Sequence, residues 1–136
     1  MKGFIDENGR ALLRVEVRPN LTLEAVAIEV WVDTGFTGDL VLPRTMIDSL
    51  SLRHSGSVDG ILADGSQIDL NTYTCFVNWF DEQRRLEVVA NDGDCPLLGV
   101  RLLLGLELRG REKGTFYFIR PEAGKSIVSP FPARPC

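Results

Sequence analysis

Most of the chain alternates between apolar and polar residues in short runs, which is the pattern of half-buried β-strands. The clearest run is residues 23–32, in which every second residue from Val26 to Val32 is apolar and β-branched. Further runs predict strands over residues 11–17, 40–42, 58–63, 67–79, 85–90, 106–109 and 115–119. Short helical segments are predicted over residues 45–52, with Thr45 as the cap, and over residues 100–104. The pattern therefore predicts an all-β fold, a small and mostly antiparallel barrel or sandwich with one or two short helices.

The predicted strand over residues 67–79 changes its apolar face midway. Ile68 and Leu70 point one way, whereas Tyr73, Cys75, Val77 and Trp79 point the other way. A strand changes its buried face only through a bulge, a strong twist or a change of neighbours, so we expect this strand to cross between layers. Asp64-Gly65 before it predicts a hairpin turn. Ser51 and residues 53–60 are expected to be looser, and residues 80–84 to form a polar turn.

Length and composition agree with one folded unit. The 136 residues are 44% hydrophobic and 25% charged, which suits a single domain with its own core. We place that domain over residues 1–120. Residues 121–136 contain four prolines, at positions 121, 130, 132 and 135, and we expect a Pro-rich C-terminal tail that is extended or mobile.

Charge and cysteine usage exclude several classes of partner. The net charge is −4 and the longest basic run is Arg84-Arg85, so no nucleic-acid partner is expected. The first ten residues lack the apolar segment of a signal peptide, and no run approaches the roughly 20 apolar residues of a membrane span. Cys75, Cys95 and Cys136 are odd in number and form no Cys-x-x-Cys, which favours reduced thiols in the cytoplasm.

The single histidine, His54, excludes a multi-histidine metal site within one chain. A Ser-His-Asp triad would need this imidazole, yet neither Ser55 nor Ser57 beside it lies in a Gly-x-Ser-x-Gly motif. We therefore interpret His54 as a solvated loop residue. Glycine-rich nucleotide motifs are also missing from the sequence, so we expect no metal and no cofactor.

The residues that carry chemistry are Asp33-Thr34-Gly35, at the end of the apolar run 23–32. A lone carboxylate near a hydrophobic interior is costly, and the same three residues would also suit an ordinary turn. Two carboxylates placed side by side share a proton, so that one serves as base and the other as acid. Such a pair activates a water molecule and protonates a leaving amine without a metal.

With Phe36 next, this segment resembles the active-site motif of the retropepsin-like aspartic peptidases, especially their bacterial branch with Asp-Thr-Gly-Phe. Residues 40–43 followed by a short helix are similar to the segment after the family's active-site loop. The hairpin around Ala63, Asp64, Gly65 and Ser66 resembles the flap that closes over the substrate. Leu97-Leu98-Gly99 resembles the hydrophobic-hydrophobic-glycine motif behind the catalytic loop. The likeness covers residues 11–119.

The resemblance implies a small closed antiparallel β-barrel and a role for each matching residue. Asp33 would be the catalytic acid and base, and Thr34 would make hydroxyl contacts across a dimer axis. Gly35 would let the substrate backbone approach, and Phe36 with the hairpin tip would contact the substrate. Gly99 would allow close packing beneath the loop. We also expect Arg101 to pair with Asp39, in place of the polar pair common in the family.

Only one Asp-Thr-Gly occurs in the chain, so a catalytic pair requires a second copy meeting the first on a two-fold axis. The first hypothesis is therefore a homodimeric aspartic endopeptidase that acts on a peptide or protein. The alternative is a binding module that holds a peptide or protein on the same barrel without cleaving it. Nothing in the sequence argues positively for a third hypothesis, an antitoxin-like or scaffold subunit.

Overall fold

The structure is a computed structural model that describes residues 1–110 and 113–121, so most of the expected Pro-rich tail lies outside the described residues. Its elements follow one another in the order β1 (Lys2–Ile5), β2 (Ala11–Arg18), β3 (Val26–Asp33), β4 (Leu40–Pro43), α1 (Arg44–Leu50), β5 (Arg53–Ile61), β6 (Gln67–Trp79), β7 (Glu82–Asn91), β8 (Leu97–Gly99), the 3₁₀ turn η1 (Val100–Leu103), β9 (Glu107–Gly110) and β10 (Thr115–Ile119).

Six strands close into a barrel in the ring order β2, β3, β8, β4, β7 and β6. The pairing of β6 with β2, at Val77 opposite Val17, completes the ring. The predicted closed barrel is thus confirmed, and most of its pairings are antiparallel. Two pairings are parallel, that of β3 with β8 and that of β4 with β7.

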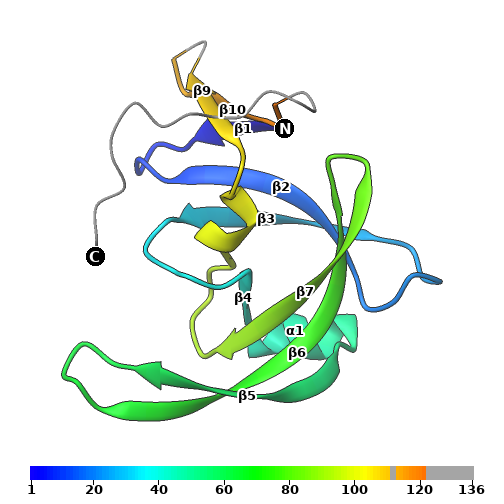
Figure 1. Cartoon of the computed structure of the whole chain (residues 1–136), viewed down its shortest axis with the longest axis vertical. Coiled ribbons are helices and arrows are strands. Elements are labelled where there is room, and N and C mark those ends of the chain that lie inside the picture. The colour runs from blue at the N-terminus through cyan, green and yellow to red at the C-terminus, as the bar shows by residue number, and fades with distance from the viewer. Residues whose placement is uncertain (111–112, 122–136) are drawn as a thin grey trace.

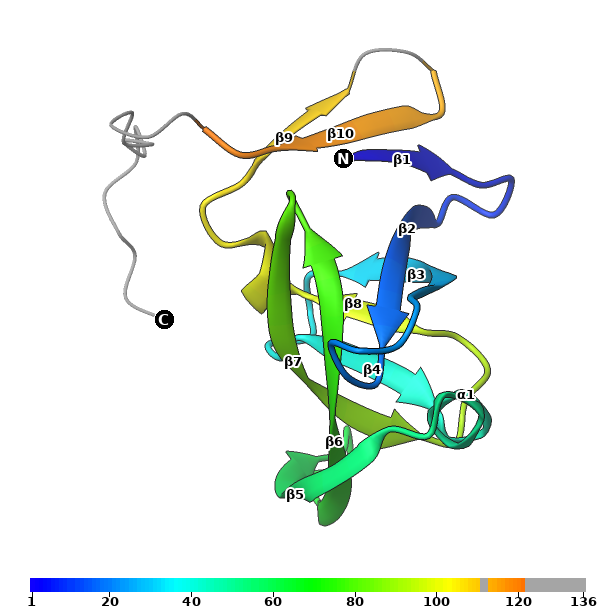
Figure 2. The same cartoon turned by 90° about the vertical axis from the view of Figure 1, so that its right-hand side faces the viewer.

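Two extensions leave the barrel at opposite ends (Figures 1 and 2). At one end the β5–β6 hairpin projects beyond the ring. At the other end β1, β10 and β9 continue the sheet beyond β2, with β9 last in the strand order. The alternation of residues did not predict β1, because Lys2–Ile5 is short and has no clear period of two.

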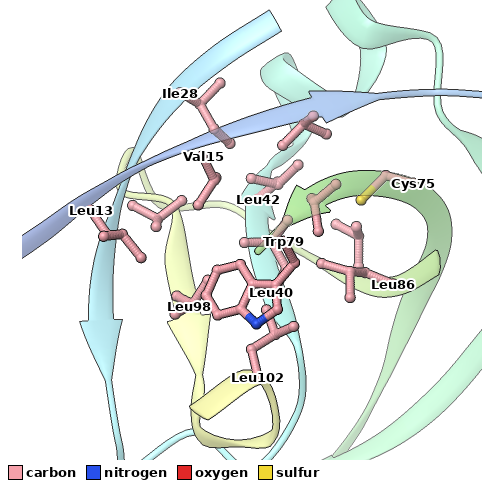
Figure 3. Close-up of a cluster of buried hydrophobic side chains, with 14 of the residues drawn as sticks. Leu13, Val15, Ile28, Leu40, Leu42, Cys75, Trp79, Leu86, Leu98 and Leu102 are labelled. Atoms are coloured by element: carbon pink, nitrogen blue, oxygen red, sulfur yellow. The ribbon is translucent and has the colours of Figure 1, made fainter. Parts of the chain in front are cut away.

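The core lies inside the barrel around Trp79, which is fully buried (Figure 3). Side chains on a strand alternate between the two faces, so every second residue of β2 and β7 enters this core. Its largest buried members come from five strands and the turn η1; they are Leu13, Leu40, Leu42, Trp79, Leu86, Leu98 and Leu102.

The long strand β6 changes its neighbours where its apolar face changes. From Gln67 onward it pairs with β5, and from Thr72 onward it also pairs with β7. The first part therefore belongs to the projecting hairpin, whereas Cys75 and Val77 are buried in the barrel. This confirms that the strand passes from one layer to another.

Three local predictions were wrong. Residues 53–60 are not loose, since β5 spans Arg53–Ile61. His54 is an exposed strand residue, and its ring centroid lies 5.4 Å from that of Tyr73 in an edge-on arrangement. Likewise β7 begins at Glu82, because pairing with β6 extends strand structure into polar residues. Pro43, not Thr45, occupies the N-cap of α1, because the chain enters the helix directly from β4.

Candidate active site

Asp33 is the last residue of β3 and is followed by the loop over residues 34–39. Its side chain is partly buried, whereas Thr34 and Gly35 are exposed. The Gly35 N–H donates to Asp33 Oδ1 at 3.0 Å, and the Phe36 N–H donates to the Asp33 carbonyl at 3.2 Å. These two bonds hold the loop in a tight turn and orient one carboxylate oxygen.

Strand β8 lies behind this loop, as the predicted role of Leu97-Leu98-Gly99 requires. It runs parallel to β3, with Gly99 in register with Asp33. The Val100 N–H donates to the Phe36 carbonyl at 2.8 Å, and the Gly99 N–H donates to the Asp39 carbonyl at 2.8 Å. The loop is therefore braced from behind at its middle and at its end.

Gly99 leaves no room for a side chain. A Cβ built on it would lie 2.0 Å from the Gly38 carbonyl oxygen and 2.7 Å from Cδ2 of Phe36. A Cβ at Gly35 would lie 3.2 Å from Asp33 Oδ1, next to the carboxylate itself. Gly99 therefore packs directly under the loop, where a Cβ would not fit.

Asp39 is a buried carboxylate at the end of the loop, 7% exposed. Its Oδ2 accepts a hydrogen bond from the Glu87 N–H at 3.2 Å. Its Oδ1 has no hydrogen-bond partner, and Nε of Arg101 lies 4.0 Å away. The predicted pairing of Arg101 with Asp39 is present at the limit of an ion pair. The Glu87 contact was not predicted, because it joins segments 48 residues apart.

The β5–β6 hairpin ends in the predicted Asp-Gly turn. The Leu62 N–H donates to the Ser66 carbonyl at 2.8 Å, and Gly65 has a φ of +85°, which favours glycine. Asp64 Oδ1 accepts hydrogen bonds from the Ser66 hydroxyl at 2.6 Å and from the Ser66 N–H at 2.8 Å. These bonds, the hydroxyl first, lower the pKa of the Asp64 carboxyl.

A cavity of about 520 Å³ separates the loop from the hairpin, and we call it the cleft. Gly35 and Phe36 line one side of it. The middle of the hairpin and β7 supply apolar residues on the other side, namely Val58, Ile61, Leu70 and Val89. The tip residues Ala63, Asp64, Gly65 and Ser66 do not line the cleft. The cleft therefore lies between the loop and the middle of the hairpin, and the hairpin tip does not line it.

Thr34 lines a different cavity, an apolar groove of about 540 Å³ that we call the Thr34 groove. It lies between the loop and the strands β1, β9 and β10. Its main apolar members are Ile5, Val32, Leu103, Leu106, Leu108 and Phe118. The two residues that follow Asp33 therefore line different cavities: Thr34 lines the Thr34 groove and Gly35 lines the cleft.

Within residues 1–110 and 113–121, no group of three or more His, Cys, Asp or Glu side chains could hold a metal ion. No helix in the same part of the chain is long and apolar enough to cross a membrane.

No protein-family model and no curated protein matches the sequence. Among solved structures, the chain is similar to a retropepsin-like aspartic protease from Rickettsia conorii, with 20% identity, a TM-score of 0.61, and coverage of 87% of this chain and 88% of that one. It is also similar to the EIAV protease in complex with the inhibitor HBY-793, with 15% identity, a TM-score of 0.52, and coverage of 72% and 88%. The chain therefore has the fold of the retropepsin-like aspartic proteases.

Proposed function

We propose that the protein is an aspartic endopeptidase in which two Asp33 carboxylates, one from each subunit of a homodimer, activate the attacking water. The observation that carries the proposal is the braced Asp33-Thr34-Gly35 loop on a retropepsin-like fold. With one proton shared between the two carboxylates, one takes a proton from water and the other donates a proton to the leaving amine. Phe36 after the motif supports the bacterial branch of the family.

The homodimer follows from the count of catalytic motifs. One chain holds a single Asp-Thr-Gly, so the second carboxylate must come from a second copy. Thr34 is exposed beside Asp33, which leaves it free to contact the equivalent loop of that copy. Gly35 presents backbone and no side chain next to the carboxylate, which suits close approach of a substrate.

The substrate we propose is an extended peptide that lies in the cleft between the loop and the β5–β6 hairpin. A peptide in this position would bond through its backbone like an added strand, and side-chain pockets would set its preference. The exposed Ile61 and Leu62 near the hairpin tip are available to close over it. In this role the hairpin is the flap, and the tip residues Ala63–Ser66 reach the substrate only when it closes.

We also propose that the protein works in the cytoplasm. Among the described residues, Cys75 and Cys95 are free cysteines, and one of them is buried. Free thiols persist in a reducing compartment.

The proposal is tested by Asp33→Asn, which keeps the shape of the side chain and removes its acid chemistry. We expect cleavage of an unfolded protein substrate at mildly acid pH to fall by more than about 10²-fold, while the circular dichroism spectrum stays unchanged. Asp48→Asn, at an exposed position in α1, is the matched control and should cleave normally. Undiminished cleavage by Asp33→Asn would remove Asp33 from the mechanism. A strictly monomeric protein that binds peptides without cleaving them would favour the binding module.

A further inference from the structure

Another cavity, of about 690 Å³, lies at the base of the β5–β6 hairpin, and we call it the arginine pocket. The start of β5 supplies Arg53, His54 and Ser55 to its lining, and β7 supplies Arg85. Other parts of the lining come from β6, from the end of β2 onward and from the end of α1, which leads into β5 (Figure 2). No described residue lines both this pocket and the cleft or the Thr34 groove.

The strand register places both arginines on one face of the sheet. Arg53 is opposite Thr74 across β5 and β6. Arg85 is opposite Phe76 across β6 and β7. Directly opposed residues share a face, and residues 74 and 76 are two positions apart on β6, so all four side chains leave the same side. Strands β5 and β7 are about 10 Å apart across β6, so two long arginine side chains can reach one ligand between them.

A bulge explains how neighbouring residues of β5 line one cavity. The register with β6 shifts between His54 and Gly56, which leaves Ser55 as an extra residue. Strand β5 is also the first strand in the sheet order, at the edge of the sheet. A bulge bends such a strand and redirects its side chains. Arg53 and His54 therefore both line the pocket, although strict alternation would send them to opposite faces.

The pocket is cationic, whereas the chain as a whole carries a net charge of −4. Among the described residues that line it, none is an aspartate or a glutamate. Neither Arg53 nor Arg85 forms an ion pair within the described part of the chain. Glu87, which is opposite Thr74 on β7, lines the cleft instead. Two guanidinium groups without a protein carboxylate therefore face a shared cavity, and guanidinium groups bind carboxylates and phosphates strongly.

Neutral side chains add hydrogen-bond donors to the pocket. Asn20 Oδ1 accepts hydrogen bonds from the Thr22 hydroxyl at 2.7 Å, the Thr22 N–H at 3.0 Å and the Leu23 N–H at 3.1 Å. These bonds fix the Asn20 side chain, and its remaining polar atom, Nδ2, is a donor. Ser51 and Thr74 add hydroxyl groups to the lining. Such a set of donors suits a phosphate, which offers three strong acceptor oxygens, better than a carboxylate, which offers two.

Phe76 gives the same pocket an apolar surface. Its ring is half-buried on the outer side of β6, beside the buried Cys75 and Val77 that point into the barrel. A cavity of this size lies in the range of roughly 300–1,000 Å³ that is typical of small-molecule sites. The pocket therefore suits a ligand that carries an organic group as well as an anion.

We propose that the arginine pocket binds a small organic phosphate. Arg53 and Arg85 hold the phosphate group, and the organic group packs against Phe76. Asn20 donates a further hydrogen bond from the far wall. The site is separate from Asp33 and from the cleft, so the inference does not depend on the proposed peptidase activity.

Phenyl phosphate tests the proposal, titrated into the full chain and followed by calorimetry. We expect it to bind about tenfold more tightly than inorganic phosphate, because its ring packs on Phe76. It should also bind more tightly than benzoate, which carries the same ring on a carboxylate. Arg53→Gln and Arg85→Gln should each weaken binding about tenfold or more, with an unchanged circular dichroism spectrum. Arg14→Gln, at an exposed position of β2 outside the pocket, is the control for the change in charge and should bind normally.

Two further variants separate the parts of the proposal. Phe76→Leu should remove most of the preference for phenyl phosphate over inorganic phosphate, while Asp33→Asn should bind phenyl phosphate like the wild type. The pocket would be overturned if phenyl phosphate failed to bind at millimolar concentration or bound equally well to both arginine variants. Benzoate that bound as tightly as phenyl phosphate would overturn the assignment of a phosphate. Loss of peptidase activity in Asp33→Asn reports on the proposed function alone.

Discussion

Gly99 provides the sharpest test of how β8 supports the loop that begins at Asp33. In Gly99→Ala the new Cβ would start 2.0 Å from the Gly38 carbonyl oxygen, whereas ordinary contact begins at 3.4 Å. The two groups must separate by about 1.4 Å, the difference of these distances. The obstacle is backbone, so no side-chain rotation relieves it. Overpacking of this kind costs about 1–3 kcal/mol, and we expect the upper part of that range.

The displaced segment is continuous with Asp33, the proposed catalytic residue, because only residues 34–37 lie between Asp33 and Gly38. A misplacement of about 1 Å at a reacting group can cost about 10²-fold in rate. We therefore expect Gly99→Ala to lose about 2–3 kcal/mol in urea unfolding and about 10²-fold in peptide cleavage. Both should be measured at one protomer concentration, because the stability of a dimer depends on it.

Gly93→Ala is the matched control. Its new Cβ would approach nothing closer than the Asn91 amide at 3.6 Å, which is ordinary contact. This variant should stay within about 0.5 kcal/mol of the wild type and cleave normally. If Gly99→Ala were equally harmless, the close packing of β8 against the loop would be refuted as a requirement for the site.

Three further predictions follow from buried and paired groups. Burial raises the pKa of the Cys75 thiol to about 12, so iodoacetamide should modify Cys75 only after unfolding, as mass spectrometry would show. Hydrogen bonding with Asp59 across the hairpin raises the pKa of the Asp69 carboxyl. The stabilisation that this pairing gives the hairpin is therefore present at low pH and lost as the pH rises through the raised pKa. Asp69→Asn should remove this pH dependence from hydrogen exchange in the hairpin, and an unchanged dependence would contradict the pairing. Leu98→Ala should cost about 2–5 kcal/mol in urea unfolding, and Leu21→Ala, at a 56% exposed position, less than about 0.5 kcal/mol; equal costs would contradict the assigned core.

Local signals in the sequence predicted the parts of the site that depend on neighbouring residues. The Asp-Gly turn at Asp64 and the loop after Asp33 are each built by hydrogen bonds between residues two to four positions apart. The crossing of β6 between layers was also predictable, because its apolar residues change face near Tyr73.

Contacts between distant segments were less accessible to sequence reasoning. The start of β5 at Arg53 and that of β7 at Glu82 depend on pairing with β6, and polar exposed positions carry little strand pattern. The burial of Asp39 depends on Glu87, which lies on another strand. Only the motif order of a known family connected Asp33 with Gly99 before the structure placed them in register.

The central claim is that two Asp33 carboxylates, one from each chain, form a single catalytic site. Mixing the wild type with Asp33→Asn, after reversible dissociation to allow exchange of subunits, tests it directly. Only a dimer of two wild-type chains would cleave, so activity should follow the square of the wild-type fraction and reach about one quarter in an equal mixture. Activity that fell in simple proportion to the wild-type fraction, to about one half, would mean that each chain acts alone and would contradict the shared site.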